Sequence, residues 1–263
     1  MQAGLSRFGT DFGNGRADQL FFSQDETRPH CLAEKARLQA LYPSQNDGVV
    51  AGDAEQRVLE AARGWMLATL RREGQAEPPE LGLDRLGERL AEDFVVLHCP
   101  PDEHDRALFT HVYFPSGWRP EHVLGRSFLE IHARIPAFEQ VARAAASLTD
   151  SMAGRGPYVR FVWTIAADAE LDHHPDHGAR AAWSAQTPRA FLRVERQVTV
   201  PLAPVPASLF LIRTYLYGFD ELSSEQRAVL ARALELMPPE LLRYKQLEQA
   251  RPRALELLQL AGR

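Results

Sequence analysis

The chain is poor in two residue types that often define a function, cysteine and lysine. Its 263 residues include two cysteines, Cys31 and Cys99, and two lysines, Lys35 and Lys245. Two thiolates are too few for the four-cysteine ligation of an ordinary iron–sulfur cluster, and they do not resemble the cysteine-dense pattern of a secreted disulfide scaffold. The 30 basic residues therefore comprise 28 arginines and two lysines, and the arginines are scattered rather than clustered.

Long apolar runs and the common catalytic motifs are also missing. The longest apolar stretches, such as Ala207–Ile212, are too short to span a bilayer. The N-terminus lacks a basic segment followed by an apolar run, so we expect no signal peptide, no membrane contact and a cytoplasmic location. With a net charge of −5 and no basic patch interleaved with aromatics, nucleic-acid binding is not expected. No nucleophile elbow, P-loop or dinucleotide-binding fingerprint is present.

The sequence does contain a clear succession of helical and strand patterns. Helices are predicted at 30–42, after Asp53, at 83–91, at 138–152, after Ser223, whose spacing to Gln226 forms a capping box, and at 253–260. Five strands are predicted at 94–97, 107–114, 157–165, 191–200 and 208–217. Strands interrupted by helices, without regular β–α alternation, predict an α+β fold: an antiparallel five-stranded sheet with helices packed on one side. Residues 1–20 are expected to form a polar arm, and 21–263 a single domain with flanking N- and C-terminal helices.

Unusual residues are densest in the segment 114–136, which reads FPSGWRPEHVLGRSFLEIHARIP. Its prolines and glycines predict a defined loop between a strand and a helix. Within it, His132 lies between apolar neighbours. A neutral imidazole held there can ligate iron through one nitrogen while the other is oriented by an acceptor. The alternative is a core histidine bonded to a backbone carbonyl.

The strand FLRVERQVTV at 191–200 alternates polar and apolar residues. Arg193, Glu195 and Gln197 share one face, and Arg196 intrudes on the other. The polar row either lines a pocket, with Glu195 binding an amine or relaying protons, or simply faces solvent. In the strand 208–217, Arg213 and Tyr215 also alternate with apolar residues. These arginines are candidate partners of an anion such as a heme propionate, or members of a structural ion-pair network.

A third histidine-containing segment, DHHPDH at 172–177, invites a metal assignment. Pro175 and the absence of helical spacing between the histidines favour a solvated loop over a metal site.

The order of several segments resembles the heme-dependent oxidative N-demethylase alpha-subunit-like family, whose best-known activity is the demethylation of dimethylamine. The resemblance extends over nearly the whole chain. The similar segments are FFSQDETRPHCLAEKARL, LAEDFVVL, FPSGWRPEHVLGRSFLEIHARIP, FLRVERQ, SLFLIRTYL and LLRYKQL.

This resemblance implies a PAS-like fold that encloses a b-type heme. In such a monooxygenase the iron activates dioxygen, an N-methyl group of a small alkylamine is hydroxylated, and the carbinolamine collapses to formaldehyde and a shorter amine. Electrons come from NADPH through a separate reductase that carries FMN and a 2Fe-2S cluster. The resemblance makes His132 the leading axial ligand, Glu195 the residue that handles the substrate amine, and Arg193, Arg196, Arg213 and Tyr215 the candidate heme-binding residues.

One position departs from the family pattern. Where the family leads us to expect Arg-x-Asn-Trp, the chain reads Arg160, Phe161, Val162, Trp163. A site built around that amide would treat its substrate differently without it. Two alternatives to the enzyme therefore stay open: a non-catalytic heme or small-ligand sensor of PAS-like fold, and a scaffold that has lost heme.

Overall fold

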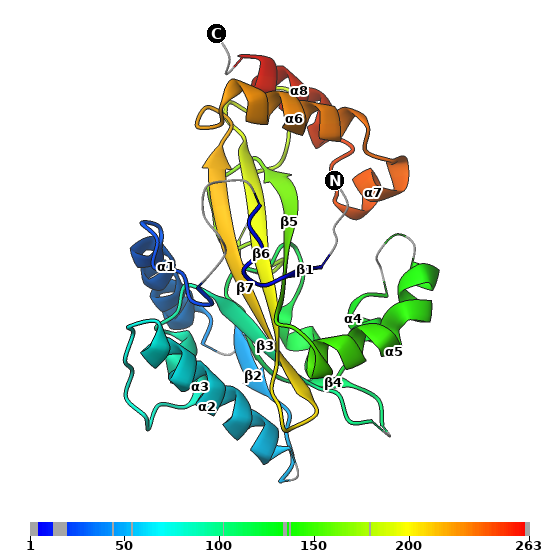
Figure 1. Cartoon of the computed structure of the whole chain (residues 1–263). Coiled ribbons are helices and arrows are strands. Elements are labelled where there is room, and N and C mark those ends of the chain that lie inside the picture. Colours follow the sequence, from blue (N-terminus) through cyan, green and yellow to red (C-terminus); the bar gives the residue numbers. More distant parts are fainter. Residues whose placement is uncertain are drawn as a thin grey trace.

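The protein forms a seven-stranded antiparallel sheet with helices on both faces and at one end (Figure 1). The computed structural model describes residues 5–12, 20–43, 45–53, 55–101, 103–133, 136, 138–178 and 180–260. The strands are β1 (Ser6–Arg7), β2 (Asp47–Val49), β3 (Asp93–His98), β4 (Arg106–His111), β5 (Tyr158–Ala166), β6 (Phe191–Pro201) and β7 (Ala207–Gly218). Their order across the sheet is β1-β5-β6-β7-β3-β4-β2. The helices are α1 (Arg28–Leu41), α2 (Gln56–Arg72), α3 (Leu83–Gly87), η1 (Pro120–His122), α4 (Phe128–Ile131), α5 (Phe138–Gly154), α6 (Ser224–Glu235), α7 (Pro239–Tyr244) and α8 (Ala250–Leu260).

The α+β class and all five predicted strands are confirmed, but the sheet is wider than the predicted five strands. The additional strands, β1 and β2, are two and three residues long and lie at opposite edges. Their backbones pair with β5 and β4, while their side chains show no alternation of apolar and polar residues. Such short edge strands are defined by pairing alone, so a pattern-based prediction misses them. Of the predicted polar arm, residues 1–4 and 13–19 lie outside the described part.

The prediction that the helices pack on one side of the sheet was wrong. Met66 and Leu70 of α2 pack against Phe94, Val96 and other residues of one face, which we call the α2 face. Alternate residues of the same strands point the other way: Leu97 packs against Ala107 and Met152 of α5. We call this opposite side the α5 face. A sheet whose central strands are apolar on both sides needs a cover on both sides, since each exposed apolar side chain would forgo about 1.5–3 kcal/mol of burial.

The C-terminal helices pack at the far end of β5, β6 and β7 (Figure 1). Their core joins Leu234 of α6 and Ala254 of α8 to Ile165 and Phe219. The predicted capping box is confirmed, because Ser223 accepts a hydrogen bond from the backbone N–H of Gln226 and the Gln226 side chain accepts one from the Ser223 N–H.

The predicted start of the second helix is corrected. Asp53 is not its N-cap; the cap residue is Glu55, whose carboxylate accepts a hydrogen bond from the Gly52 N–H at 2.8 Å and pairs with Arg106 on β4. The helix therefore begins later than predicted, at a residue that also forms an ion pair with a strand residue 51 positions away. In the described part of the chain, none of the helices has both the length and the apolarity needed to cross a membrane.

Candidate functional site

His132 follows the short helix α4, which a capping box starts. The Ser127 side chain and the Glu130 backbone N–H form one half of that box, and the Glu130 carboxylate with the Ser127 N–H forms the other. The box fixes the turn on which His132 is the C-cap residue. The Nδ1 atom of His132 lies 2.8 Å from the Phe128 carbonyl oxygen, and the two rings pack with centroids 4.2 Å apart.

This contact determines what the imidazole can do. A carbonyl oxygen only accepts, so Nδ1 carries the proton, and Nε2 keeps its lone pair. Burial lowers the pKa of His132 below its usual value, which favours this neutral form at pH 7. No described residue hydrogen-bonds Nε2. The bond to a backbone carbonyl is the one that the alternative interpretation of the sequence predicts, whereas iron ligation by Nε2 stays a prediction.

A chain of three hydrogen-bonded side chains lies on the α5 face of β5 and β6. Arg160 pairs with Gln197 in register, and Val162 pairs with Glu195. The Arg160 Nε donates to Gln197 Oε1 at 2.6 Å, and Gln197 Nε2 donates to Glu195 Oε2 at 2.9 Å. Because Gln197 must accept on one side and donate on the other, its amide orientation is fixed and the Glu195 carboxylate is held.

The electrostatic couplings bring His132 into the same neighbourhood. Burial is the main cause of the lowered pKa of His132, the positive charge of Arg160 lowers it further, and the hydrogen bond to Phe128 opposes the shift. Tyr244 of α7 is coupled to both Glu195 and Arg160, although burial is the main cause of its raised pKa. His132, Arg160, Glu195, Gln197 and Tyr244 thus form one group, which we call the α5-face cluster.

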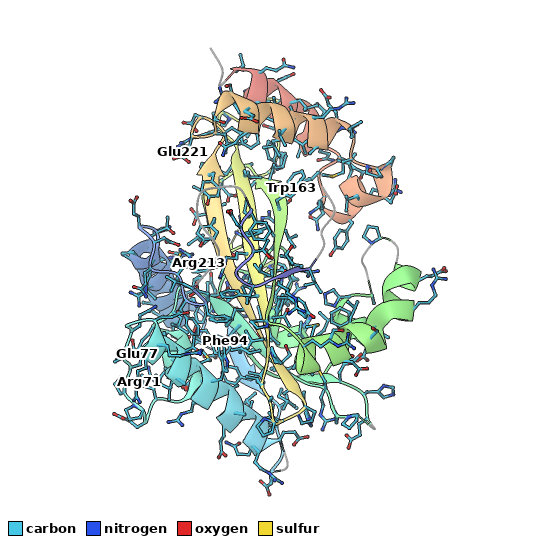
Figure 2. The ribbon with its side chains drawn as sticks, in the orientation of Figure 1. Arg71, Glu77, Phe94, Trp163, Arg213 and Glu221 are labelled. Atoms are coloured by element: carbon cyan, nitrogen blue, oxygen red, sulfur yellow. The ribbon has the colours of Figure 1, made fainter. Side chains whose placement is uncertain are left out.

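Lys245 lies beside this cluster, just after α7. Its Nζ donates to the Trp163 carbonyl oxygen at 2.6 Å and lies 5.6 Å from the centroid of the Trp163 ring. Burial lowers the pKa of Lys245, and the Glu195 charge opposes that shift. Figure 2 shows Trp163 on β5, below the C-terminal helices. Lys245 thereby joins the end of α7 to a backbone carbonyl of β5.

Arg193 also points to the α5 face, but its side chain is engaged with the backbone. It is fully buried, with its two terminal nitrogens donating to the carbonyl oxygens of Leu171 at 2.8 Å and Phe114 at 2.7 Å. The nearest carboxylate contact, to Glu195, is 4.0 Å long. Arg193 therefore joins the segment around Leu171 to the segment that follows β4.

Arg196, Arg213 and Tyr215 lie on the α2 face, across the sheet from Glu195. Arg196 is the register partner of Arg213 and donates to the Leu20 carbonyl oxygen at 2.6 Å. Arg213, on the α1 side in Figure 2, donates to Asp25 at 2.9 Å, to the Thr27 hydroxyl at 2.6 Å and to the Cys31 sulfur at 2.9 Å. These side chains hold residues 20–31 against the sheet. Sequence alternation alone could not show this, because it does not say what covers each face.

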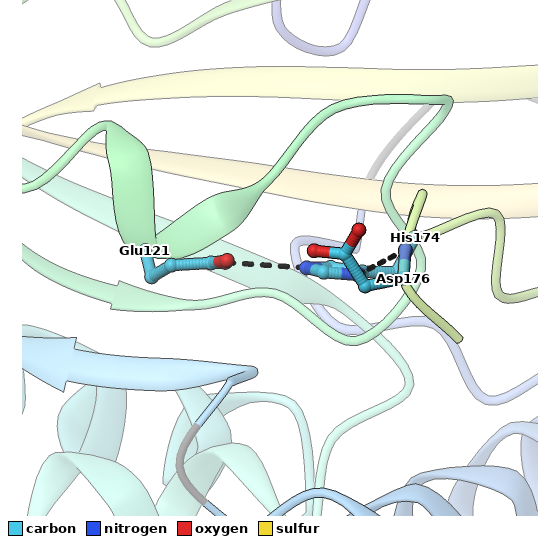
Figure 3. A group of neighbouring side chains, drawn as sticks. All are labelled: Glu121, His174 and Asp176. Carbon is cyan, nitrogen blue, oxygen red and sulfur yellow. Dashed lines mark hydrogen bonds and ion pairs between the residues drawn. The ribbon is translucent and has the colours of Figure 1, made fainter.

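The histidine segment 172–177 is not the solvated loop that the sequence predicts. His173 and His174 are buried, and His174 Nε2 lies 3.2 Å from a carboxylate oxygen of Glu121 (Figure 3). His174 Nδ1 accepts the Asp176 backbone N–H, and the Asp176 carboxylate pairs with Arg119 at 2.7 Å. Glu121, His174 and Asp176 have the donor types of a metal site, but their present contacts join the loop to η1 instead.

The sequence reasoning overlooked three members of this region as site residues: Arg160, Tyr244 and Lys245. For Arg160 a signal existed, since alternation along β5 places it beside Gln197 of the neighbouring strand. Tyr244 and Lys245 gave none, because their positions depend on how α7 folds back onto the sheet.

Comparison with known families agrees with the resemblance seen in the sequence. A sequence model of a family described as "Haem-dependent oxidative N-demethylase, alpha subunit-like" matches residues 37–255. The match covers β2 to β7, helices α2 to α7 and every member of the α5-face cluster. It leaves out residues 20–31, which Arg196 and Arg213 hold. The chain belongs to the haem-dependent oxidative N-demethylase, alpha subunit-like family.

Proposed function

We propose that this protein is a heme-dependent monooxygenase that removes an N-methyl group from a small alkylamine. It would use dioxygen and electrons from a separate reductase and release formaldehyde. The observation that carries the proposal is the state of His132, a neutral imidazole oriented by the Phe128 carbonyl with Nε2 left for a ligand. Family membership supports the dependence on heme.

The residues of the α5-face cluster suit a b-type heme in donor chemistry. His132 Nε2 would hold the iron, and the Phe128 carbonyl would keep the ring in the required tautomer. When bound, the heme supplies dioxygen activation and hydroxylation of the N-methyl carbon. The chain's own residues supply binding, orientation and control of protons.

Glu195 is suited to hold the substrate. Gln197 occupies one carboxylate oxygen of Glu195, so the other can accept an N–H from an alkylammonium. Val162, the register partner of Glu195, adds an apolar side chain on the same face of the sheet, which suits an N-methyl group. In the protonated carbinolamine product, Glu195 Oε1 would accept the hydroxyl proton while the nitrogen keeps its own proton, so the C–N bond breaks to give formaldehyde and the shorter neutral amine.

The overall reaction needs two electrons from outside the chain. A methylated amine, dioxygen, two electrons and two protons give the demethylated amine, formaldehyde and water. With two cysteines in its sequence, the chain cannot ligate a four-cysteine iron–sulfur cluster. We therefore propose a partner reductase that carries FMN and a 2Fe-2S cluster and oxidises NADPH.

The test begins with absorption spectra of the purified chain and of His132→Ala, both reconstituted with heme. We expect a Soret band in the wild type, its shift or loss in the variant, and its recovery when free imidazole is added. In the presence of a suitable reductase, dimethylamine should then stimulate NADPH oxidation with one formaldehyde formed per turnover.

Each negative outcome has a distinct meaning. A Soret band that ignores the substitution would exclude His132 as the ligand. A heme-loaded chain that binds amines without turnover would point to a non-catalytic sensor. The absence of a Soret band in both proteins would exclude the proposed function and favour a heme-free scaffold.

A further inference from the structure

Arg160 differs from the other arginines of the central strands in what its guanidinium contacts. Its Nε donates to Gln197, but no described residue accepts a hydrogen bond from its two terminal nitrogens, and no described carboxylate forms an ion pair with it. Both terminal nitrogens of Arg193 donate hydrogen bonds to backbone carbonyls, and those of Arg213 donate to Asp25, Thr27 and Cys31. Arg160 therefore keeps a planar pair of donors unused.

The surroundings of Arg160 favour a partner of opposite charge. The side chain is partly buried, and burial is the main cause of its lowered pKa. A carboxylate that pairs with the guanidinium would stabilise its charge in this position. Glu195 does not neutralise it directly, because the Gln197 amide lies between them.

The shape of the free donors selects the ligand. Two parallel N–H groups match the two oxygens of a carboxylate, and this bidentate pairing is stronger and more directional than a contact to a single atom. Arg160 and Glu195 are diagonal neighbours on paired strands, which places their backbones about 7–8 Å apart. A positive and a negative binding group thus lie side by side on the α5 face.

We propose that Arg160 forms a carboxylate-binding subsite next to the amine-binding Glu195. The inference rests on the proposed function and deepens it, because the carboxylate has two possible sources. If it belongs to the substrate, the enzyme acts on an N-methylated amino acid, whose ammonium binds Glu195 and whose carboxylate binds Arg160. If it belongs to the cofactor, Arg160 binds a propionate of the porphyrin.

The experiment compares wild type with Arg160→Met and with Arg155→Met as a matched control. Arg155 is exposed just after α5, so its replacement removes the same charge outside the cluster. Each protein is titrated with N,N-dimethylglycine and with dimethylamine by calorimetry, and the heme-free form is titrated with heme by its Soret band. Arg160→Lys, which keeps the charge but not the fork, replaces Arg160→Met if that variant does not fold.

For the substrate source, we expect wild type to bind N,N-dimethylglycine at least about tenfold more tightly than dimethylamine. Arg160→Met should abolish that preference by weakening the binding of N,N-dimethylglycine far more than the binding of dimethylamine. For the cofactor source, we expect no such preference and a heme affinity reduced about tenfold in Arg160→Met. Equal heme affinity and equal binding of both amines in wild type, Arg160→Met and Arg155→Met would overturn the subsite.

These outcomes are separate from a failure of the proposed function. Both titrations measure binding and need neither reductase nor turnover. A chain that never demethylates an amine could still bind heme or N,N-dimethylglycine more weakly when Arg160 is replaced. In that case the proposed reaction would be wrong and the carboxylate subsite would stand.

Discussion

Two arginines on opposite faces of the central strands, Arg213 and Arg160, differ in how their charge is used. On the α2 face, Arg213 is fully buried and each of its terminal nitrogens is bonded to protein atoms. On the α5 face, Arg160 and His132 are partly exposed, and each keeps hydrogen-bonding capacity that no described residue uses. The proposed site is therefore marked by unused donors and acceptors beside a held carboxylate, and not by the burial of a charged group.

The largest effect should come from replacing Arg213, whose terminal nitrogens are bonded to protein atoms. Arg213→Met should lower the free energy of unfolding by about 3 kcal/mol, because it leaves Asp25 without its ion-pair partner. We take the lower end of the usual range, since the Asp25 side chain is 33% exposed. Urea denaturation measures the change, and limited proteolysis should show faster cleavage in residues 20–31.

Arg160→Met provides the contrast for this measurement. It replaces an arginine on the other face of the same strands, where we expect less than about 1 kcal/mol of destabilisation because no ion pair is broken. Equal destabilisation by the two substitutions would refute the distinction between the faces.

Glu195→Gln should have the next largest effect, on binding rather than on folding. The substitution keeps the shape but removes the charge that would hold an alkylammonium. A hydrogen bond to a charged group contributes about 1.5–3 kcal/mol, so dimethylamine should bind about 10- to 100-fold more weakly. Calorimetric titration of the heme-loaded protein measures it, with Glu225→Gln, at an exposed position in the first turn of α6, as the control. Unchanged binding in Glu195→Gln would remove Glu195 from the site.

The sequence could predict these strands well and their meaning only in part. Alternation in 191–200 separated Arg193 and Glu195 from Arg196, as the structure confirms. It could not tell which arginine would be satisfied, because the partners of Arg213 come from residues 25–31 and those of Arg193 from two loops. Such partners are determined by long-range packing, which leaves no periodic trace.

A third test uses the pH dependence of stability to measure how well water is excluded from the α2 face. His111, at the end of β4, is fully buried and stacks on Phe94. Burial, aided by the charge of Lys35, holds the pKa of His111 well below its usual value. The unfolded chain gains a proton below about pH 6.5 while folded His111 does not, so stability falls as the pH decreases, by up to about 1.4 kcal/mol per unit.

His111→Phe should remove that part of the slope. Urea denaturation at several pH values between 7.5 and 5 measures the slope of the free energy of unfolding against pH. In the variant this slope should correspond to the uptake of about one proton fewer on unfolding. His132→Phe, on the partly exposed α5 face, should flatten the slope less, because the pKa of His132 is lowered to a smaller extent. An identical pH dependence of wild type and His111→Phe would mean that water reaches His111.

The smallest effect should separate the two faces within one strand. Val162 points toward Glu195, whereas its neighbour Phe161 is 40% exposed on the opposite face, across from Arg196. Val162→Asn and Phe161→Asn should each cost about 1 kcal/mol or less in strand preference. Only Val162→Asn adds an amide on the face that carries the Glu195 carboxylate. Dimethylamine and trimethylamine donate different numbers of N–H groups, so the new amide should change their relative affinity. One neutral hydrogen bond of about 1 kcal/mol corresponds to a change of about fivefold in that ratio. If Phe161→Asn changed that ratio equally, the effect would come from a general destabilisation of β5, and the proposal that the substrate binds on the α5 face would be wrong.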